Sequence, residues 1–136
     1  MTDHKIRILL VEDSPIASRL ITLLLKEGMP DGEYELFLDS NLTDAINRTS
    51  EKNIQLVLLD LGLPESQGLD TFKTFFAKFP YIPVIVLTGN ENKSLILKAV
   101  RESTQDYFVK GEVHSTLLAP SIFYAVERGR LQYEKM

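Results

Sequence analysis

The chain contains no cysteine, only two histidines and no long apolar run. Without cysteine there can be no disulfide, no thiolate nucleophile and no zinc site built on thiolates. No stretch of the sequence reaches the length that an apolar membrane span requires. The N-terminal residues meet the charged pair Glu12-Asp13 too early to form a signal peptide. We therefore expect a cytoplasmic protein without a membrane partner.

Positive charge is outweighed by negative charge, because 15 Lys and Arg stand against 19 Asp and Glu and give a net charge of −4. This balance argues against nucleic acid as a partner of this domain. The 136 residues are enough for one domain with its own core. We expect a single domain over residues 1–136, with its core at about residues 6–128. Residues 129–136 are expected to extend the last helix, and an output domain could follow them.

Short apolar runs alternate along the chain with amphipathic stretches. Predicted strands cover residues 6–11, 34–38, 56–60, 83–87 and 107–109. Predicted helices cover residues 14–28, 42–52, 69–79, 93–102 and 115–132. Ser14 is the expected N-cap of the first helix, and Ser40 or Asn41 that of the second. This alternation predicts an α/β domain, with a five-stranded parallel sheet and helices on both faces.

Helical spacing predicts which side chains face the core. The first helix has an apolar stripe of Ile16, Leu20, Leu23 and Leu24. The third helix has a stripe that we interpret as core rather than as a ligand site: Leu69, Phe72, Phe76 and Phe79.

The last helix carries more apolar residues than one inward stripe can use. Leu118, Ile122 and Ala125 form the expected inward stripe. Pro120 falls inside the same helix and should bend it, because proline has no amide hydrogen to donate. Further apolar residues are left over for a partner or homodimer face: Leu117, Phe123 and Tyr124.

Four of the five predicted strands end in polar residues with useful chemistry. The apolar run before Asp60 is typical of a strand buried on both faces, and the other strands end at Glu12-Asp13, Thr88 and Lys110. In a parallel sheet all these ends lie on one edge, where ligands bind. Asp60 alone could be a turn or helix cap, and all four could be unrelated caps. Their joint occurrence at the strand ends favours one site.

The residue types at this edge indicate phosphoryl chemistry. Clustered carboxylates tend to raise a pKa or to hold a hard cation. A donor set of oxygens alone suits Mg²⁺, which keeps several waters and uses one or two carboxylates. A lysine and a threonine hydroxyl can contact the oxygens of a phosphoryl group. The set therefore predicts formation of an acyl phosphate on an aspartate.

The sequence resembles the response-regulator receiver domains of two-component signalling, and within them the chemotaxis regulators. The resemblance covers about residues 6–128. It rests on four motifs: Leu9-Leu10-Val11-Glu12-Asp13-Ser14, Leu59-Asp60-Leu61-Gly62-Leu63-Pro64 with Gly68, Val86-Leu87-Thr88-Gly89, and Asp106-Tyr107-Phe108-Val109-Lys110.

The resemblance implies the flavodoxin-like doubly wound fold with strand order 2-1-3-4-5. It also implies that Asp60 accepts a phosphoryl group from a sensor histidine kinase or a phosphotransfer protein. Mg²⁺ would be bound by Asp13 and Asp60, by Glu12 through water, and by the backbone carbonyl of Gly62.

The remaining implied roles concern the response to phosphorylation. Lys110 would pair with a phosphoryl oxygen, Thr88 would move to hydrogen-bond the phosphoryl group, and Tyr107 would turn inward as a switch. The readout surface would be the fourth helix, the fifth strand and the last helix. Such a domain is an enzyme only in its own phosphorylation and dephosphorylation.

The sequence departs from the family pattern at two positions. Gly111 stands where the family usually has a proline with a cis peptide bond, so we predict a trans bond between residues 110 and 111. Ser103 stands where the fourth helix usually ends in glycine. It must therefore take a positive φ, or the helix must end differently.

Three other functions are weaker. A receiver fold that only binds proteins, without phosphorylation, would be expected to lose Asp60 or Lys110, and both are present. A small-molecule phosphatase would need a second carboxylate at position 62, which is glycine, and a substrate-covering cap. A flavin-binding protein would need a hydroxyl-rich phosphate loop where Glu12-Asp13 stands.

Overall fold

The computed structural model describes residues 5–89, 94 and 106–134. The strands are β1 Ile6–Val11, β2 Tyr34–Asp39, β3 Leu56–Asp60, β4 Gly62–Leu63, β5 Ser66–Gln67, β6 Val84–Thr88 and β7 Asp106–Val109. The helices are α1 Pro15–Gly28, α2 Leu42–Lys52, α3 Leu69–Lys78 and α5 Ser115–Glu134. Of the predicted helix at residues 93–102 only Ser94 is described, and it is helical. The rest of that range and Ser103 lie outside the described residues.

The main sheet has five parallel strands in the order β2-β1-β3-β6-β7. Counted along the chain, this is the predicted order 2-1-3-4-5, and the doubly wound fold is confirmed. The central strand β3 is buried at all five positions, as its continuous apolar run predicts. The register places Asp60 beside Leu87, so that β1, β3 and β6 end at the same edge of the sheet.

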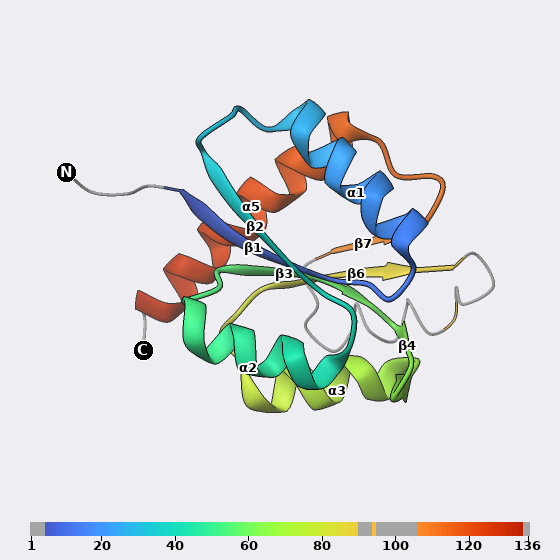
Figure 1. The fold of residues 1–136 in the computed structure, drawn as a ribbon. Coiled ribbons are helices and arrows are strands. Elements are labelled where there is room, and N and C mark those ends of the chain that lie inside the picture. Colours follow the sequence, from blue (N-terminus) through green and yellow to red (C-terminus); the bar gives the residue numbers. More distant parts are fainter. Residues whose placement is uncertain (1–4, 90–93, 95–105, 135–136) are drawn as a thin grey trace.

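The helices form a layer on each face of the sheet, as predicted. Figure 1 shows α1 and α5 on one face and α2 and α3 on the other. Each face has its own core, because alternate residues of the strands point in opposite directions. Thus Ile8, Leu10 and Leu58 lie in the core under α1 and α5, and Leu9, Val57 and Leu59 lie in the core under α2 and α3.

The predicted inward stripe of α1 is wrong at three of its four positions, and only Leu24 packs against the core. Ile21 and Leu25 are the buried residues of this helix, whereas Ile16 is 84% exposed and Leu23 is 49% exposed. Leu20 is also exposed, and Leu24 is half-buried. Apolar residues occupy so many adjacent positions of α1 that the sequence predicts a helix but not which of its faces points inward. Packing against both the sheet and α5 determines the inward face.

The predicted stripe of α3 is correct only in part. Phe72 and Phe75 are fully buried, while Phe76 and Phe79 are partly buried at the edge of the core. The rings of Phe72 and Phe76 stack with their centroids 5.5 Å apart. Phe75, rather than Phe76, is therefore the second core residue of this helix.

The inward stripe of α5 is confirmed, because Leu118, Ile122 and Ala125 are all buried. The helix begins at Ser115 and continues through Pro120, which leaves the Thr116 carbonyl without the amide donor that another residue would supply. On the outer face Leu117 and Tyr124 are 57% and 64% exposed.

Two glycines let α5 lie close to its neighbours. A Cβ on Gly28 would lie 2.9 Å from the carbonyl oxygen of Ser115, and a Cβ on Gly129 would lie 2.9 Å from Cδ of Pro83. Glycine inside a helix is unfavourable by about 1 kcal/mol relative to alanine. At Gly129 the close approach to Pro83 explains its presence.

Several local features agree with or add to the predictions. Ser14 caps α1 and Asn41 caps α2. No described peptide bond is cis, so the predicted trans bond before Gly111 is confirmed. The short hairpin of β4 and β5, which follows Asp60, was not predicted. Among the described residues no helix combines the length and apolar character needed to cross a bilayer.

Candidate phosphoacceptor site

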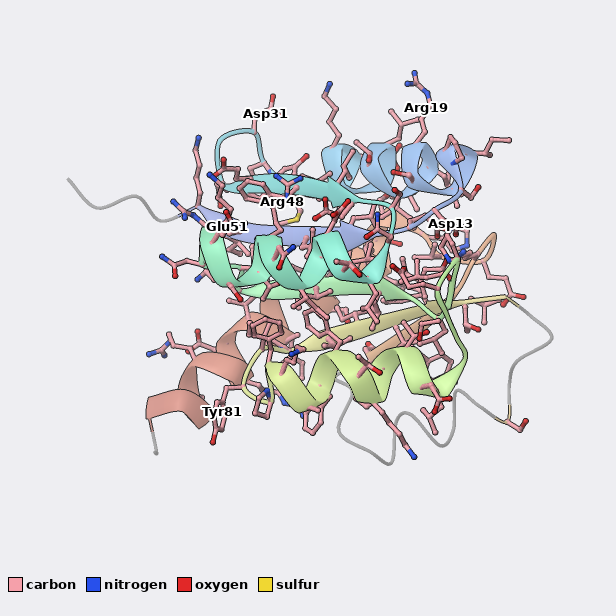
Figure 2. The ribbon with its side chains drawn as sticks, turned by 60° about the horizontal axis from the view of Figure 1, so that its bottom comes forward. Asp13, Arg19, Asp31, Arg48, Glu51 and Tyr81 are labelled. Atoms are coloured by element: carbon pink, nitrogen blue, oxygen red, sulfur yellow. The ribbon has the colours of Figure 1, made fainter. Side chains whose placement is uncertain are left out.

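The carboxyl ends of β1, β3, β6 and β7 bring the predicted residues together. Glu12 and Asp13 follow β1 directly, and the Glu12 amide is fixed by donating to the Asp39 carbonyl at 3.0 Å. The Ser14 hydroxyl then accepts from the Ala17 amide at 3.2 Å and starts α1. This cap turns the chain sharply after Asp13, which stays at the exposed edge of the sheet (Figure 2).

Three carboxylates meet at this edge. Ligand oxygens of Glu12, Asp13 and Asp60 lie within 4.8 Å of one another. Glu12 and Asp60 are 4% and 3% exposed, and Asp13 is exposed. The arrangement places two like charges in the protein interior and one at its mouth, which demands a compensating cation.

Lys110 supplies part of this compensation. Its Nζ lies 2.7 Å from Oε1 of Glu12 and 3.0 Å from Oδ1 of Asp60. Its backbone amide donates to the Thr88 carbonyl at 2.8 Å, which fixes the start of the side chain beside β6. Burial lowers the pKa of the Lys110 ammonium, but the Glu12 and Asp60 carboxylates outweigh it and raise this pKa above its ordinary value. Lys110 therefore stays charged at neutral pH.

Glu12 has the most perturbed carboxyl of the site. Its pKa is raised from 4.5 to about 7, first by burial and further by the neighbouring Asp60 carboxylate. The hydrogen bonds from Lys110 and from the Ser14 amide act in the opposite direction. Glu12 thus titrates near neutral pH when only protein groups surround it.

The loop after Asp60 is held by its own hydrogen bonds. The Gly62 amide donates to Oδ1 of Asp60 at 3.1 Å. The Gly68 amide donates to the Leu61 carbonyl at 2.7 Å and closes the loop. The buried Thr71 hydroxyl lies 3.3 Å from the same carbonyl and 2.9 Å from the Ser66 hydroxyl. Asp60 is therefore presented by a preorganised turn.

Glu65 joins this loop to α2, a role that sequence reasoning missed. Its Oε1 accepts a hydrogen bond from the Leu42 amide at 2.7 Å, and its Oε2 lies 3.4 Å from the Thr43 hydroxyl. The Leu42 amide is one of the unpaired donors at the N-terminus of α2, where a carboxylate is favourable. No local pattern could have revealed the contact, because its two residues are 23 positions apart.

Three further predicted site residues lie on β6, on β7 and in the loop after Asp60. Thr88 is 1% exposed at the end of β6, and its hydroxyl lies 3.4 Å from the Gly89 carbonyl oxygen. Tyr107 pairs with Val86 in the register of β6 and β7, and its side chain is 38% exposed. Gly62 reaches the site through its amide. The metal-binding role of its carbonyl remains a prediction.

The donor set of this site suits a hard cation. Every metal-binding side chain in the cluster is a carboxylate, and Mg²⁺ prefers oxygen ligands. Two of the carboxylates are buried with a single ammonium between them, so the cluster is short of positive charge. Glu12, Asp13 and Asp60 are therefore chemically able to hold Mg²⁺.

Comparison with known proteins now identifies the family. A family profile described as the response regulator receiver domain matches residues 8–120. The chain belongs to this family. Solved structures share the fold. A signal receiver domain of an HD domain-containing protein from Pseudomonas fluorescens aligns with a TM-score of 0.84 at 23% identity. The alignment covers 100% of this chain and 97% of that chain. A receiver domain protein from Clostridium thermocellum aligns with a TM-score of 0.80 at 24% identity over 93% of this chain and 98% of its own.

Two relatives by sequence differ in how much of their length the chain covers. The rice (Oryza sativa subsp. japonica) two-component response regulator ORR1 is 30% identical over an alignment of 112 residues, which covers 76% of this chain and 48% of the rice protein. The chemotaxis protein CheY of Listeria monocytogenes is 24% identical over 106 residues, 77% of this chain and 86% of that protein. The chain thus spans about half the length of the rice relative and most of the chemotaxis protein.

Proposed function

We propose that this receiver is a phosphoacceptor switch of a two-component phosphorelay, in which Asp60 accepts the phosphoryl group. One observation carries the proposal. A buried aspartate at the end of the central strand lies 3.0 Å from a lysine ammonium and within 4.8 Å of two further carboxylates. Structural caps have no need of this combination.

The proposed step is a displacement at phosphorus. A carboxylate oxygen of Asp60 forms the new P–O bond while the P–N bond of a phosphohistidine breaks, and the electron pair leaves with the imidazole. Lys110 and the Gly62 amide both contact Oδ1, which supports Oδ2 as the attacking oxygen. Bound Mg²⁺ would supply charge neutralisation at the phosphoryl oxygens. Asp13, Asp60 and the Gly62 carbonyl are its proposed ligands, and Glu12 would bind it through water. The domain would thus catalyse only its own phosphorylation and dephosphorylation.

Thr88 and Tyr107 are the proposed switch residues. Within the described residues, the buried Thr88 hydroxyl has only a long contact with the Gly89 carbonyl, so it can exchange this contact for a phosphoryl oxygen. Tyr107 lies partly exposed on the neighbouring strand, from which it can turn inward. We propose that β7, α5 and the segment between β6 and β7 form the readout surface.

The proposed phosphodonor is a sensor histidine kinase or a phosphotransfer protein in the cytoplasm. We propose that residues 1–136 form one receiver unit, to which an output domain could be joined after α5. A second copy of the chain is a further proposed partner, through α5. Its support is the spacing of three exposed apolar residues seven positions apart, as in a helix–helix seam: Leu117, Tyr124 and Leu131.

Intact mass spectrometry tests the proposed function. After incubation with acetyl phosphate and Mg²⁺, we expect the mass of one added phosphoryl group, absent in Asp60→Asn and absent when Mg²⁺ is chelated. Asp39→Asn is the matched control, because Asp39 ends a different strand and pairs with Arg48. If no phosphoryl group is added even at short times and low temperature, the proposal is wrong and a receiver fold that only binds proteins is favoured.

A further inference from the structure

A cavity lies at the end of the molecule opposite to Asp60. It has a volume of about 550 Å³ and lies between residues 54–55, the connection 78–83 and the last turns of α5. Residues 54–55 precede β3, whereas Asp60 ends it. Figure 2 shows Tyr81, which lines this cavity, at the opposite end of the sheet from Asp13. The volume is in the usual range for small-molecule pockets.

The walls of the cavity are mainly apolar and preformed. Of its lining residues, Ile54 and Pro83 are buried, and Phe79 and Tyr81 contribute aromatic rings. The connection contains two prolines, Pro80 and Pro83, which restrict its backbone. Binding of a ligand would therefore cost little free energy for ordering the cavity walls.

Gly129 shapes the opposite wall. It brings α5 so close to Pro83 that a Cβ would lie 2.9 Å from the ring. Gly129 and Val126 both belong to the lining of the cavity on this side. The glycine that weakens α5 thus sets how closely this wall of the cavity approaches Pro83.

The charged residues that line the cavity are both cationic, although the chain has a net charge of −4. Lys78 is exposed at the rim, and its ammonium has no ion pair within the part of the chain that the structure describes. Arg130 is paired with Glu127. The cavity therefore offers an apolar body and one available positive charge.

We propose that this cavity binds a small amphipathic anion, with an aromatic or short aliphatic body among Phe79, Tyr81 and Pro83 and an acidic group toward Lys78. The apolar walls favour the body of such a ligand, and Lys78 complements its charge. This proposal is independent of phosphorylation, because the cavity and the carboxylate cluster share no residue.

Titration of the whole ¹⁵N-labelled chain with 1-naphthoate tests the proposal, with neutral 1-naphthalenemethanol as the comparison. We expect saturable amide shifts at residues lining the cavity and an affinity for naphthoate about threefold higher than for the alcohol, the size typical of one exposed charge pair. Shifts that do not saturate, or that spread over the exposed faces of α1 and α5, would overturn the proposal.

Two surface substitutions separate charge from packing. Lys78→Gln should remove the threefold preference for naphthoate and leave the alcohol unaffected, whereas Tyr81→Ala should weaken both ligands. Lys26→Gln on α1 is the matched control and should change neither affinity. Both tested residues are exposed, so the fold should be kept, and circular dichroism checks this. An unchanged preference in Lys78→Gln would contradict the proposed orientation and with it the anion site.

Discussion

At the scale of the single residue, the buried carboxyl of Glu12 makes the stability of the fold depend on pH. The folded Glu12 has a pKa of about 7, while the unfolded chain releases the same proton near 4.5. The folded state therefore binds more protons between these values, and the free energy of unfolding falls as pH rises through them. The contribution of Glu12 to stability is full below about pH 4.5 and is lost by about pH 7.

Glu12→Gln should flatten this dependence. Urea unfolding of the metal-free protein, with chelator present, should show the variant gaining stability relative to the wild type as pH rises from about 4.5 to about 7. Glu112→Gln is the control, since Glu112 is exposed and should leave the slope unchanged. A wild-type slope retained in Glu12→Gln would mean that another group carries it.

Glu65 allows a separate prediction about the loop that presents Asp60. Glu65→Ala removes the acceptor of the Leu42 amide and should lower the free energy of unfolding by about 1 kcal/mol, as the loss of a helix cap does. Hydrogen exchange should quicken at the Leu42 amide and at the Gly62 amide, which belongs to the same loop. Glu65→Gln keeps an acceptor oxygen and should restore most of the protection. Equal exchange in all three proteins would show that the contact does not hold the loop.

At the scale of the secondary-structure element, Gly129 in α5 sets helix propensity against packing. Propensity alone predicts that Gly129→Ala stabilises the helix by up to about 1 kcal/mol. The new Cβ would lie 2.9 Å from Pro83, however, and overpacking of this kind costs about 1 to 3 kcal/mol. We expect a net loss of stability, measured by thermal or urea unfolding.

A double-mutant cycle isolates the contact. Pro83→Ala removes the ring atoms that the new Cβ would meet, so Gly129→Ala should cost less, or even stabilise, in that background. If the two substitutions are simply additive, the close approach of α5 to Pro83 is not what requires glycine.

The helices and strands also show how much of the structure can be predicted from the sequence. The five strands were predictable because each is a short apolar run with turn residues at its ends, and their parallel arrangement then brings Asp60 and Lys110 to one edge. The phase of α1 was not predictable, because adjacent apolar residues such as Leu20 and Ile21 compete for the inward position. The contact from Glu65 to Leu42 depends on how the loop after β3 lies against α2, which no local pattern encodes.

At the scale of the whole molecule, the exposed apolar row on α5 predicts that two copies of the chain associate. Tyr124 is 64% exposed at the centre of the exposed row that contains Leu117 and Leu131. We expect a larger dimer fraction after phosphorylation, measured by sedimentation, and its loss in Tyr124→Glu because a charge there would be buried at the seam. Tyr81→Glu is the control, since Tyr81 is 45% exposed on a different surface. A phosphorylated wild type that remains monomeric contradicts this partner.

Glu12 and Asp60 share the single ammonium of Lys110, so the edge of the sheet that holds them carries an uncompensated negative charge. With all three carboxylates ionised, three negative charges and one positive charge leave a sum of −2. A divalent cation cancels this sum, while a monovalent cation leaves half of it. In the proposed reaction, an incoming phosphoryl group, itself negative, would meet a neutral edge only with a divalent ion bound. The edge can thus select its ion by valence before size or coordination geometry matters.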